Sequence, residues 1–206
     1  DVYMKKNKGY TLIELIIVIS IMVILSAMSF VTIGIIKQAR YNAAATTLSN
    51  QMGALNIKTK ALSEGVQKAS KTENRDYPLC MKLQYNDSDV TLKDNTLLRA
   101  GTYSLILGYH TDSGFVPKES GVVETSLTNM ITITYEPETD AQKGGFADQD
   151  FVTDENDRSV CKNMYIEFDK SNGSVRYGAG KYKIVCNDRV VATVNLDQAT
   201  GNHYVK

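Results

Sequence analysis

Tryptophan is absent from this chain of 206 residues, and cysteine, proline and histidine are scarce, with three, three and two residues. Three cysteines are too few for the disulfide framework of a small secreted domain. No two of them stand at C-x-x-C spacing, so the sequence has no zinc or dithiol redox motif. Net charge is lacking too, because 23 basic residues balance 23 acidic ones, and no overall basic footprint for nucleic acid remains.

Recognisable catalytic motifs are also missing. His110 and His203 are the only histidines, and neither stands in a nucleophile or metal-ligand pattern. Ser104, Ser113 and Ser120 lack the G-x-S-x-G context of a nucleophile elbow. We therefore expect that the chain is not an enzyme and that it needs no cofactor.

A long apolar run lies near the N-terminus. From Leu15 to Ile36, 22 residues carry no charge, and as a helix they would extend about 33 Å, enough for a bilayer core of about 30 Å. Lys5, Lys6 and Lys8 precede the run and favour the cytoplasmic side for this end. The run is too long for a cleaved secretory signal, and a plain signal anchor remains the alternative.

The order Lys8-Gly9-Tyr10-Thr11-Leu12-Ile13-Glu14 resembles the processing site of type IV prepilins and of the pseudopilins of type II secretion. The resemblance implies that a membrane prepilin peptidase cuts between Gly9 and Tyr10 and methylates the new N-terminus at Tyr10. Residues 1–9 would be the leader, with Asp1-Val2-Tyr3 upstream of its Met4 start, and residues 10–36 the transmembrane and assembly helix. Tyrosine departs mildly from the phenylalanine that the family most often has after the cut.

Glu14 is the one charge within the apolar segment. A carboxylate in lipid costs on the order of a few kcal/mol, so it needs a partner. In the family, the resemblance implies, this acid pairs with the amino group of a neighbouring subunit, here at Tyr10, and sets the register of assembly. The alternative is an acid that sits at the membrane interface and faces headgroup water.

The helix should continue past the apolar run through residues 37–76. Good helix formers fill this stretch, and one apolar stripe recurs at helical spacing over Leu48, Met52, Leu55, Leu62, Val66 and Ala69. Lys71-Thr72-Glu73-Asn74 precedes the first proline, Pro78, and predicts the exit near Ser70. Many filament pilins have a proline inside this helix; none lies between Tyr10 and Asp76, which favours a pseudopilin or minor pilin.

Residues 77–206 change from helical to alternating periodicity. Strands are predicted at 102–107, 130–135, 164–168, 182–186, 190–195 and 203–205, separated by glycine and asparagine turns. Asn187-Asp188 between β-branched runs predicts a hairpin. The fold class is therefore α+β, pilin-like, with the long helix covering one face of an antiparallel β body made of two small sheets.

The C-terminal third also resembles the end of the H-type pseudopilin and FimT-like minor pilin group. Ile166-Glu167-Phe168 is followed by Asn172-Gly173-Ser174-Val175, then by Val190-Val191-Ala192-Thr193-Val194 and a final Thr200-Gly201 turn. That group has an F-x-x-x-G turn that leads into strands closed by a terminal glycine turn.

The sequence of the body offers two further candidate sites, a disulfide and a calcium site. If the body is outside the cell, Cys161 and Cys186 are the preferred disulfide, with Cys80 left over; three small buried hydrophobes are the alternative. Between Glu136 and Arg158, eight acids stand against two bases, and Asp148, Asp150 and Asp154 could gather around a calcium ion. The spacing does not match the EF-hand loop, and a solvated acidic loop is the alternative.

We therefore expect a structural subunit, a minor pilin or pseudopilin, anchored once in the bacterial cytoplasmic membrane with its body outside the cytoplasm and then assembled into a pilus or pseudopilus. Its expected partners are prepilin peptidase, other pilins, membrane lipid, and an inner-membrane platform with a cytoplasmic ATPase. Lys181, Lys183, Arg189 and Lys206 are too few to predict nucleic-acid binding. A pilus-tip adhesin, a DNA-binding minor pilin and a membrane-anchored enzyme with an unrecognised site are the alternatives.

Overall fold

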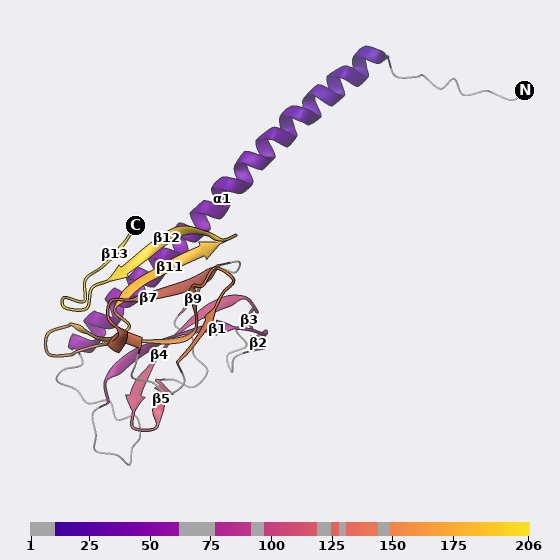
Figure 1. Ribbon diagram of the computed structural model, residues 1–206. Coiled ribbons are helices and arrows are strands. Elements are labelled where there is room, and N and C mark those ends of the chain that lie inside the picture. Colours follow the sequence, from indigo (N-terminus) through magenta and orange to yellow (C-terminus); the bar gives the residue numbers. More distant parts are fainter. Residues whose placement is uncertain (1–10, 62–76, 92–96, 119–124, 128–130, 144–148) are drawn as a thin grey trace, which may run out of the picture. The chain divides into compact units, whose positions relative to one another are not determined.

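One long helix and an antiparallel β body make up the computed structural model (Figure 1). The structure describes residues 11–61, 77–91, 97–118, 125–127, 131–143 and 149–206, without the side chains of 28–33, 90, 125 and 126. The chain divides into two compact units, Asp1–Ala39 and Arg40–Lys206. Helix α1 spans Leu12–Ala61, which confirms one continuous helix over these residues. The predicted helix start at Tyr10 and exit near Ser70 lie outside the described residues.

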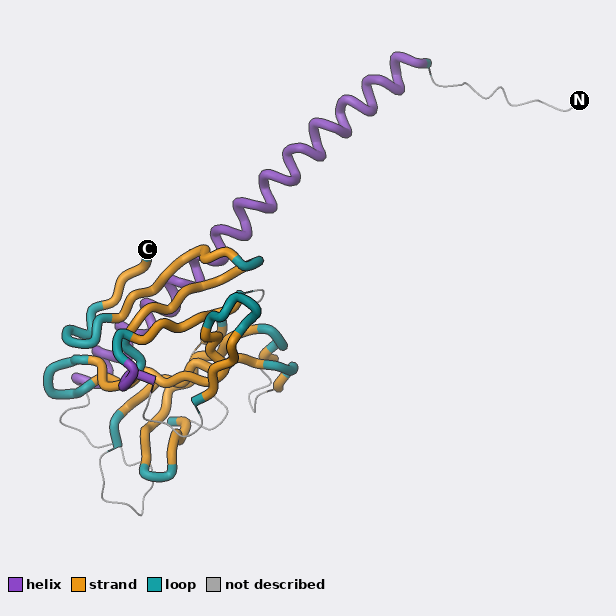
Figure 2. The backbone as a smooth tube through the Cα atoms, viewed as in Figure 1, coloured by secondary structure: helices purple, strands orange, loops and turns teal. Residues whose placement is uncertain are grey.

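In the described residues of the body, strands joined by loops make up the fold, with one short 3₁₀ turn, η2, at Asp140–Lys143 (Figure 2). The strands in chain order are β1 Leu79–Asn86, β2 Val90–Thr91, β3 Leu97–Leu98, β4 Thr102–Thr111, β5 Gly114–Pro117, β6 Thr125–Ser126, β7 Thr132–Pro137, β8 Asp150–Thr153, β9 Ser159–Phe168, β10 Val175–Tyr177, β11 Gly180–Cys186, β12 Arg189–Leu196 and β13 His203–Val205.

The expectation of two small sheets is wrong. Eleven strands join into one antiparallel sheet in the order β13-β12-β11-β7-β9-β1-β4-β5, with β10 and β8 on β9 and β6 on β4, beside a separate β2–β3 ribbon. The pairing between β7 and β9, in the middle of the sheet, is nonetheless sparse, because these strands share one ladder pair, Thr134–Val160. Two well-paired halves therefore meet at a weakly paired seam, which short sequence patterns do not reveal.

The outer part of α1 supplies one side of the core. Leu48, Met52 and Leu55 are fully buried, which confirms the first half of the predicted stripe. Tyr41, Ala44 and Ala45 extend it toward the N-terminus, while Leu62, Val66 and Ala69 lie outside the described residues. Small side chains at 44 and 45 let the helix approach the sheet closely, since alanine adds only one carbon.

All six predicted strands are present; the strand at 203–205 has the predicted bounds, and the other five differ at one or both ends. Seven further strands were not predicted. The missed β1 has a readable signal, because Leu79, Met81 and Leu83 are buried and alternate with Lys82 and Gln84, which are less so. The predicted hairpin is also confirmed: Asn187 and Asp188 have φ of 47° and 61°, as a type I′ turn between β11 and β12 requires.

Candidate functional site

The predicted cleavage residues, Gly9 and Tyr10, lie outside the described residues, and the structure begins to describe the N-terminal motif at Thr11. Thr11 precedes the helix and caps it. Its backbone N–H and its hydroxyl donate to Glu14 Oε2 at 2.9 and 3.0 Å, and its hydroxyl oxygen accepts from the Glu14 N–H at 3.3 Å. This is a capping box, in which each residue satisfies the other's free helix-end groups. The T-x-x-E spacing before an apolar run is the signal that sequence reasoning overlooked.

The capping box uses only one of the two carboxylate oxygens of Glu14. Both bonds from Thr11 end on Oε2, and within the described part of the chain Oε1 has no hydrogen-bond partner. The carboxylate is held on the first helical turn, where the helix dipole also favours negative charge. An oxygen of fixed position thus remains open to a cationic group from outside the helix.

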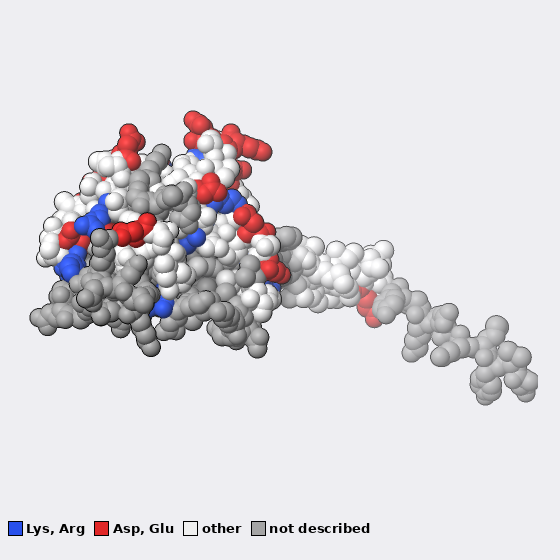
Figure 3. All heavy atoms as spheres, turned by 90° about the horizontal axis from the view of Figure 1, so that it is seen from below, with Lys and Arg blue, Asp and Glu red and all other residues white. Residues whose placement is uncertain are grey.

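The first part of α1 is apolar all round. Every large apolar side chain from Leu12 to Leu25 is at least 49% exposed, and Figure 3 shows this stretch as almost entirely uncharged. Ser20 and Ser26 donate their hydroxyls to the carbonyls of Ile16 and Met22, at 2.8 and 2.7 Å, so even these polar groups are satisfied within the helix. Among the residues that the structure describes, no helix has an 18-residue stretch apolar enough to cross a membrane.

The three cysteines are buried free thiols, so the predicted Cys161–Cys186 disulfide is not formed. Cys186 Sγ donates to the Tyr41 hydroxyl on α1 at 2.8 Å, whereas Cys161 Sγ faces Met164 Sδ at 3.9 Å. Each sulfur therefore packs against a different neighbour. Burial raises the pKa of the Cys161 thiol, which keeps it neutral and poorly reactive. The alternative of small buried hydrophobes describes them better.

The predicted calcium site lies only partly within the described residues. Asp148 lies outside the described residues, and Asp150 is exposed on β8. Asp154 instead accepts from Arg158 Nε at 2.6 Å and from the backbone N–H groups of Arg158 and Asn156. Partial burial opposes its ionisation, but these bonds outweigh it and lower the pKa of Asp154. Over the described ranges, no group of three His, Cys, Asp or Glu side chains could hold a metal ion.

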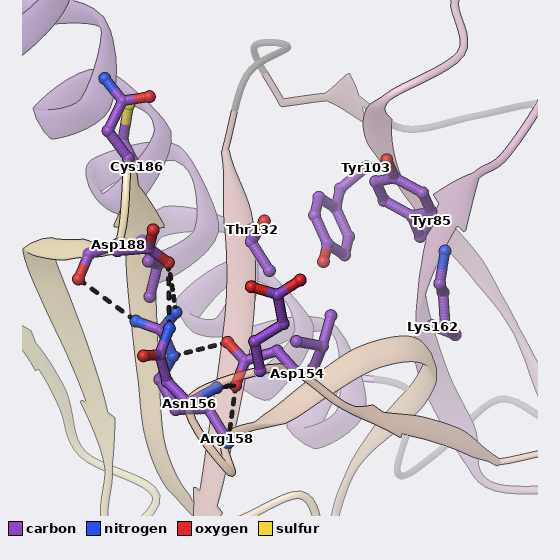
Figure 4. A pocket seen from close by; sticks show the side chains of 13 residues that line it. Tyr85, Tyr103, Thr132, Asp154, Asn156, Arg158, Lys162, Cys186 and Asp188 are labelled. Atoms are coloured by element: carbon purple, nitrogen blue, oxygen red, sulfur yellow. Dashed lines mark hydrogen bonds and ion pairs between the residues drawn. The ribbon is translucent and has the colours of Figure 1, made fainter.

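A hollow of about 430 Å³ opens where β7 and β9 separate (Figure 4). Arg158 bridges its mouth, because Nε bonds Asp154 and Nη2 bonds Asp188 Oδ1 at 2.9 Å, so one guanidinium links the β8–β9 and β11–β12 turns. Tyr103 and Tyr85 stand across from it in Figure 4, with ring centroids 5.1 Å apart. The lining also includes Thr132, Glu155, Asn156, Val160, Lys162, Val185, Cys186 and Asn187.

The two cations of this hollow already have acidic partners. Lys162 Nζ lies 2.5 Å from Asp87 Oδ1 and 3.8 Å from the Tyr85 ring centre, so its cation already has two partners. The fork of Arg158 is shared by two carboxylates. These groups are arranged to hold the two turns together, and they do not form a nucleophile with an adjacent base.

The histidines lie in different surroundings. His110 Nδ1 is 2.7 Å from Oε2 of Glu167, a fully buried carboxylate whose Oε1 accepts from Arg176 Nη1 at 2.9 Å. The bond to Glu167 raises the pKa of Arg176. Sequence reasoning missed Glu167, because an acid between Ile166 and Phe168 looks solvent-facing until β10 and β4 cover it. His203 instead packs against Gly53 of α1.

The basic residues near the C-terminus do not form a patch. Lys183 pairs with Glu136, and Lys206 Nζ lies 5.5 Å from the Tyr204 ring centre. On the face of the body drawn in Figure 3, basic and acidic side chains are interspersed. This arrangement gives no electrostatic track for a nucleic-acid backbone.

No curated protein and no solved structure matches the chain. Residues 4–30 match the family model described as the prokaryotic N-terminal methylation motif. The match begins at Met4, the residue at which the predicted leader starts, and covers Gly9, Tyr10 and Glu14. The chain therefore has a type IV prepilin-like N-terminus joined to a pilin-like α+β fold, an architecture whose members are generally non-enzymatic structural proteins.

Proposed function

We propose that the chain is a structural subunit, a minor pilin or pseudopilin, of a type IV pilus or of a type II secretion pseudopilus. It is inserted in the cytoplasmic membrane as a prepilin, with its body outside the cytoplasm, and cut by prepilin peptidase between Gly9 and Tyr10. The new N-terminus at Tyr10 is then methylated. The subunit assembles through its apolar helix, with a membrane platform and a cytoplasmic ATPase supplying the work.

The observation that carries this proposal is the all-round apolar start of α1 directly behind the methylation motif. An exposed helix with such a surface is stable only in lipid or among similar helices. The uncharged sequence runs from Leu15 to Ile36 and includes residues 28–33, whose side chains lie outside the described part. Insertion before cleavage and helix packing after assembly would both bury it.

The hydrogen bonding of Glu14 supports a role of this residue in subunit recognition. Its Oε2 is used by the Thr11 cap, and its Oε1 is open among the described contacts. A neighbour's N-terminal amine at that oxygen would neutralise the carboxylate in a medium of low dielectric, where an unpaired charge is costly. The cap holds the acid in place before the partner arrives, which reduces the entropy that pairing must overcome.

A DNA-binding minor pilin is the weaker candidate. Of its four candidate bases, Lys183 is paired with an acid and Lys206 lies over a tyrosine ring. The balanced charge of the body also opposes a strongly salt-dependent interaction with phosphates.

Intact-mass spectrometry tests the proposal. The chain is co-expressed with a prepilin peptidase, alongside Gly9→Ala as the processing-deficient variant and Gly34→Ala as a matched control in the apolar helix. A methyl group added at Gly34 meets open space. Wild type and Gly34→Ala should lose residues 1–9 and gain one methyl group, whereas Gly9→Ala should stay uncut. A wild-type chain that keeps its lysines beside an active peptidase would establish a plain signal anchor instead.

A further inference from the structure

Four polar or aromatic side chains from four neighbouring strands form a row on one face of the sheet. Glu136 on β7 pairs with Lys181 on β11, Lys181 pairs with Asn195 on β12, and Asn195 pairs with Tyr204 on β13. Residues directly opposite in a ladder point to the same face, so the row crosses three strand spacings, about 14 Å.

This row faces away from the helix. His203, the neighbour of Tyr204, packs against Gly53 of α1, and side chains alternate along a strand. In Figure 1 the outer part of α1 passes behind β11 and β12, which leaves the other face of these strands uncovered by it.

A hollow of about 390 Å³ lies over the row. Glu138 and Asp197 add carboxylates to its rim, and Tyr204 at the sheet edge is 50% exposed. Asn195 Nδ2 is covered and has no hydrogen-bond partner among the described residues. A ligand would first have to displace the atoms that cover Nδ2. Its acceptor would then supply the hydrogen bond that this amide donor lacks.

The chemistry of the lining selects a ligand class. The Asn195 amide both donates and accepts, and Lys181 donates. Glu136 accepts with Oε2, because its Oε1 is already paired with Lys183. The Tyr204 ring adds a flat apolar surface with a polar tip. A sugar ring has the complementary shape, with a C–H face that stacks on an aromatic ring and hydroxyls at its edge that both donate and accept.

The balance of charge argues against anionic ligands. Three carboxylates line the hollow against one lysine, and Lys183 neutralises one of them, Glu136, so one net negative charge remains to repel phosphates, nucleic acids and acidic polymers. The lining is also too polar for an apolar ligand, since only Pro137, Leu196 and the Tyr204 ring are apolar. We infer that this row binds a neutral oligosaccharide, across more than one sugar ring, an activity independent of filament assembly.

Binding of neutral hexasaccharides tests the inference. The full chain is held in phospholipid nanodiscs, free of detergents with sugar head groups, and titrated calorimetrically with maltohexaose, cellohexaose, mannohexaose and chitohexaose. At least one should bind. Tyr204→Ala should weaken that binding about tenfold or more, and Tyr204→Phe should stay within about twofold, because the phenyl ring keeps the stacking surface. Asn195→Ala should lose several-fold.

Val190→Ala is the matched control, because Val190 is an exposed residue of the same strand as Asn195 and lies outside the row. It should bind as the wild type does, and circular dichroism checks that each variant remains folded. The inference is overturned if none of the four sugars binds. Equal affinity of Tyr204→Ala and Val190→Ala would overturn it as well, and so would binding of polylysine with no sugar bound.

Discussion

Replacing Tyr103 by phenylalanine should weaken the seam between the two halves of the sheet. Tyr103 projects from β4 and is fully buried. Its hydroxyl donates to the carbonyl of Cys161 on β9 and accepts from the N–H of Ile133 on β7, both at 3.0 Å. These bonds join β7 and β9 where the ladder itself supplies one residue pair. The substitution removes one oxygen atom and leaves both backbone groups without that partner.

The loss of stability follows from the two backbone groups, the Cys161 carbonyl and the Ile133 N–H, that lose their hydrogen-bond partner. A buried donor or acceptor left unsatisfied costs about 1–3 kcal/mol, so the expected loss in unfolding free energy is about 2–3 kcal/mol after partial relaxation. For a protein of this size, that lowers the melting temperature by about 4–12 °C. Urea and thermal unfolding of the body, followed by circular dichroism on the full chain, measure both quantities.

Tyr85→Phe is the matched control. The two rings lie 5.1 Å apart in an edge-on arrangement, but the Tyr85 hydroxyl has no hydrogen-bond partner in the part of the chain that the structure describes. Its removal should change stability by less than about 0.5 kcal/mol. If both variants lost stability equally, or if Tyr103→Phe were neutral, the seam would not depend on this hydroxyl.

Three other outcomes are expected. Glu14→Gln should retain the helix cap, because glutamine also serves at this position, yet both Glu14→Gln and Glu14→Ala should abolish filament assembly; a Gln variant that assembles would assign Glu14 to capping alone. Arg158→Gln should speed hydrogen exchange in the β8–β9 and β11–β12 turns together, and acceleration in only one turn would contradict the bridge. Stability should fall as the pH rises above about 10, by about 1.4 kcal/mol per pH unit for each buried tyrosine, because burial raises the pKa of the folded phenols and only the unfolded chain ionises there. Urea midpoints between pH 7 and 11 measure this effect, and a flat profile would contradict it; the tyrosines concerned are Tyr103, Tyr135 and Tyr182.

Local patterns predicted the helix and six of the thirteen described strands. The stripe through Leu48, Met52 and Leu55 has helical spacing, and burial of these side chains confirms it. The β1 strand was missed although its alternation is visible, because Lys82 and Gln84 dilute a short segment. The capping role of Glu14 was not predicted, although its T-x-x-E spacing from Thr11 is visible in the sequence.

The predicted sites of the body depended on proximity, which spacing in the sequence does not supply. Cys161 and Cys186 lie in neighbouring parts of the sequence, yet their sulfurs contact Met164 and Tyr41 respectively. Asp154 looked free to bind a cation, but Arg158 four residues later occupies it. Glu167 was not predicted to be buried, and His110 and Arg176 from two other strands pair with it.

The sequence by itself determined the prepilin-like N-terminal motif of this protein and its division into helix and β body. Both depend on local order: the leader, the glycine, the acid and the apolar run are contiguous, and periodicity is a property of short segments. Only the tertiary structure decided the sheet order, the seam between β7 and β9 and the row from Glu136 to Tyr204. These features join residues that are up to 87 positions apart, as Cys80 and Glu167 are, since ladder pairing and burial depend on where the whole chain folds.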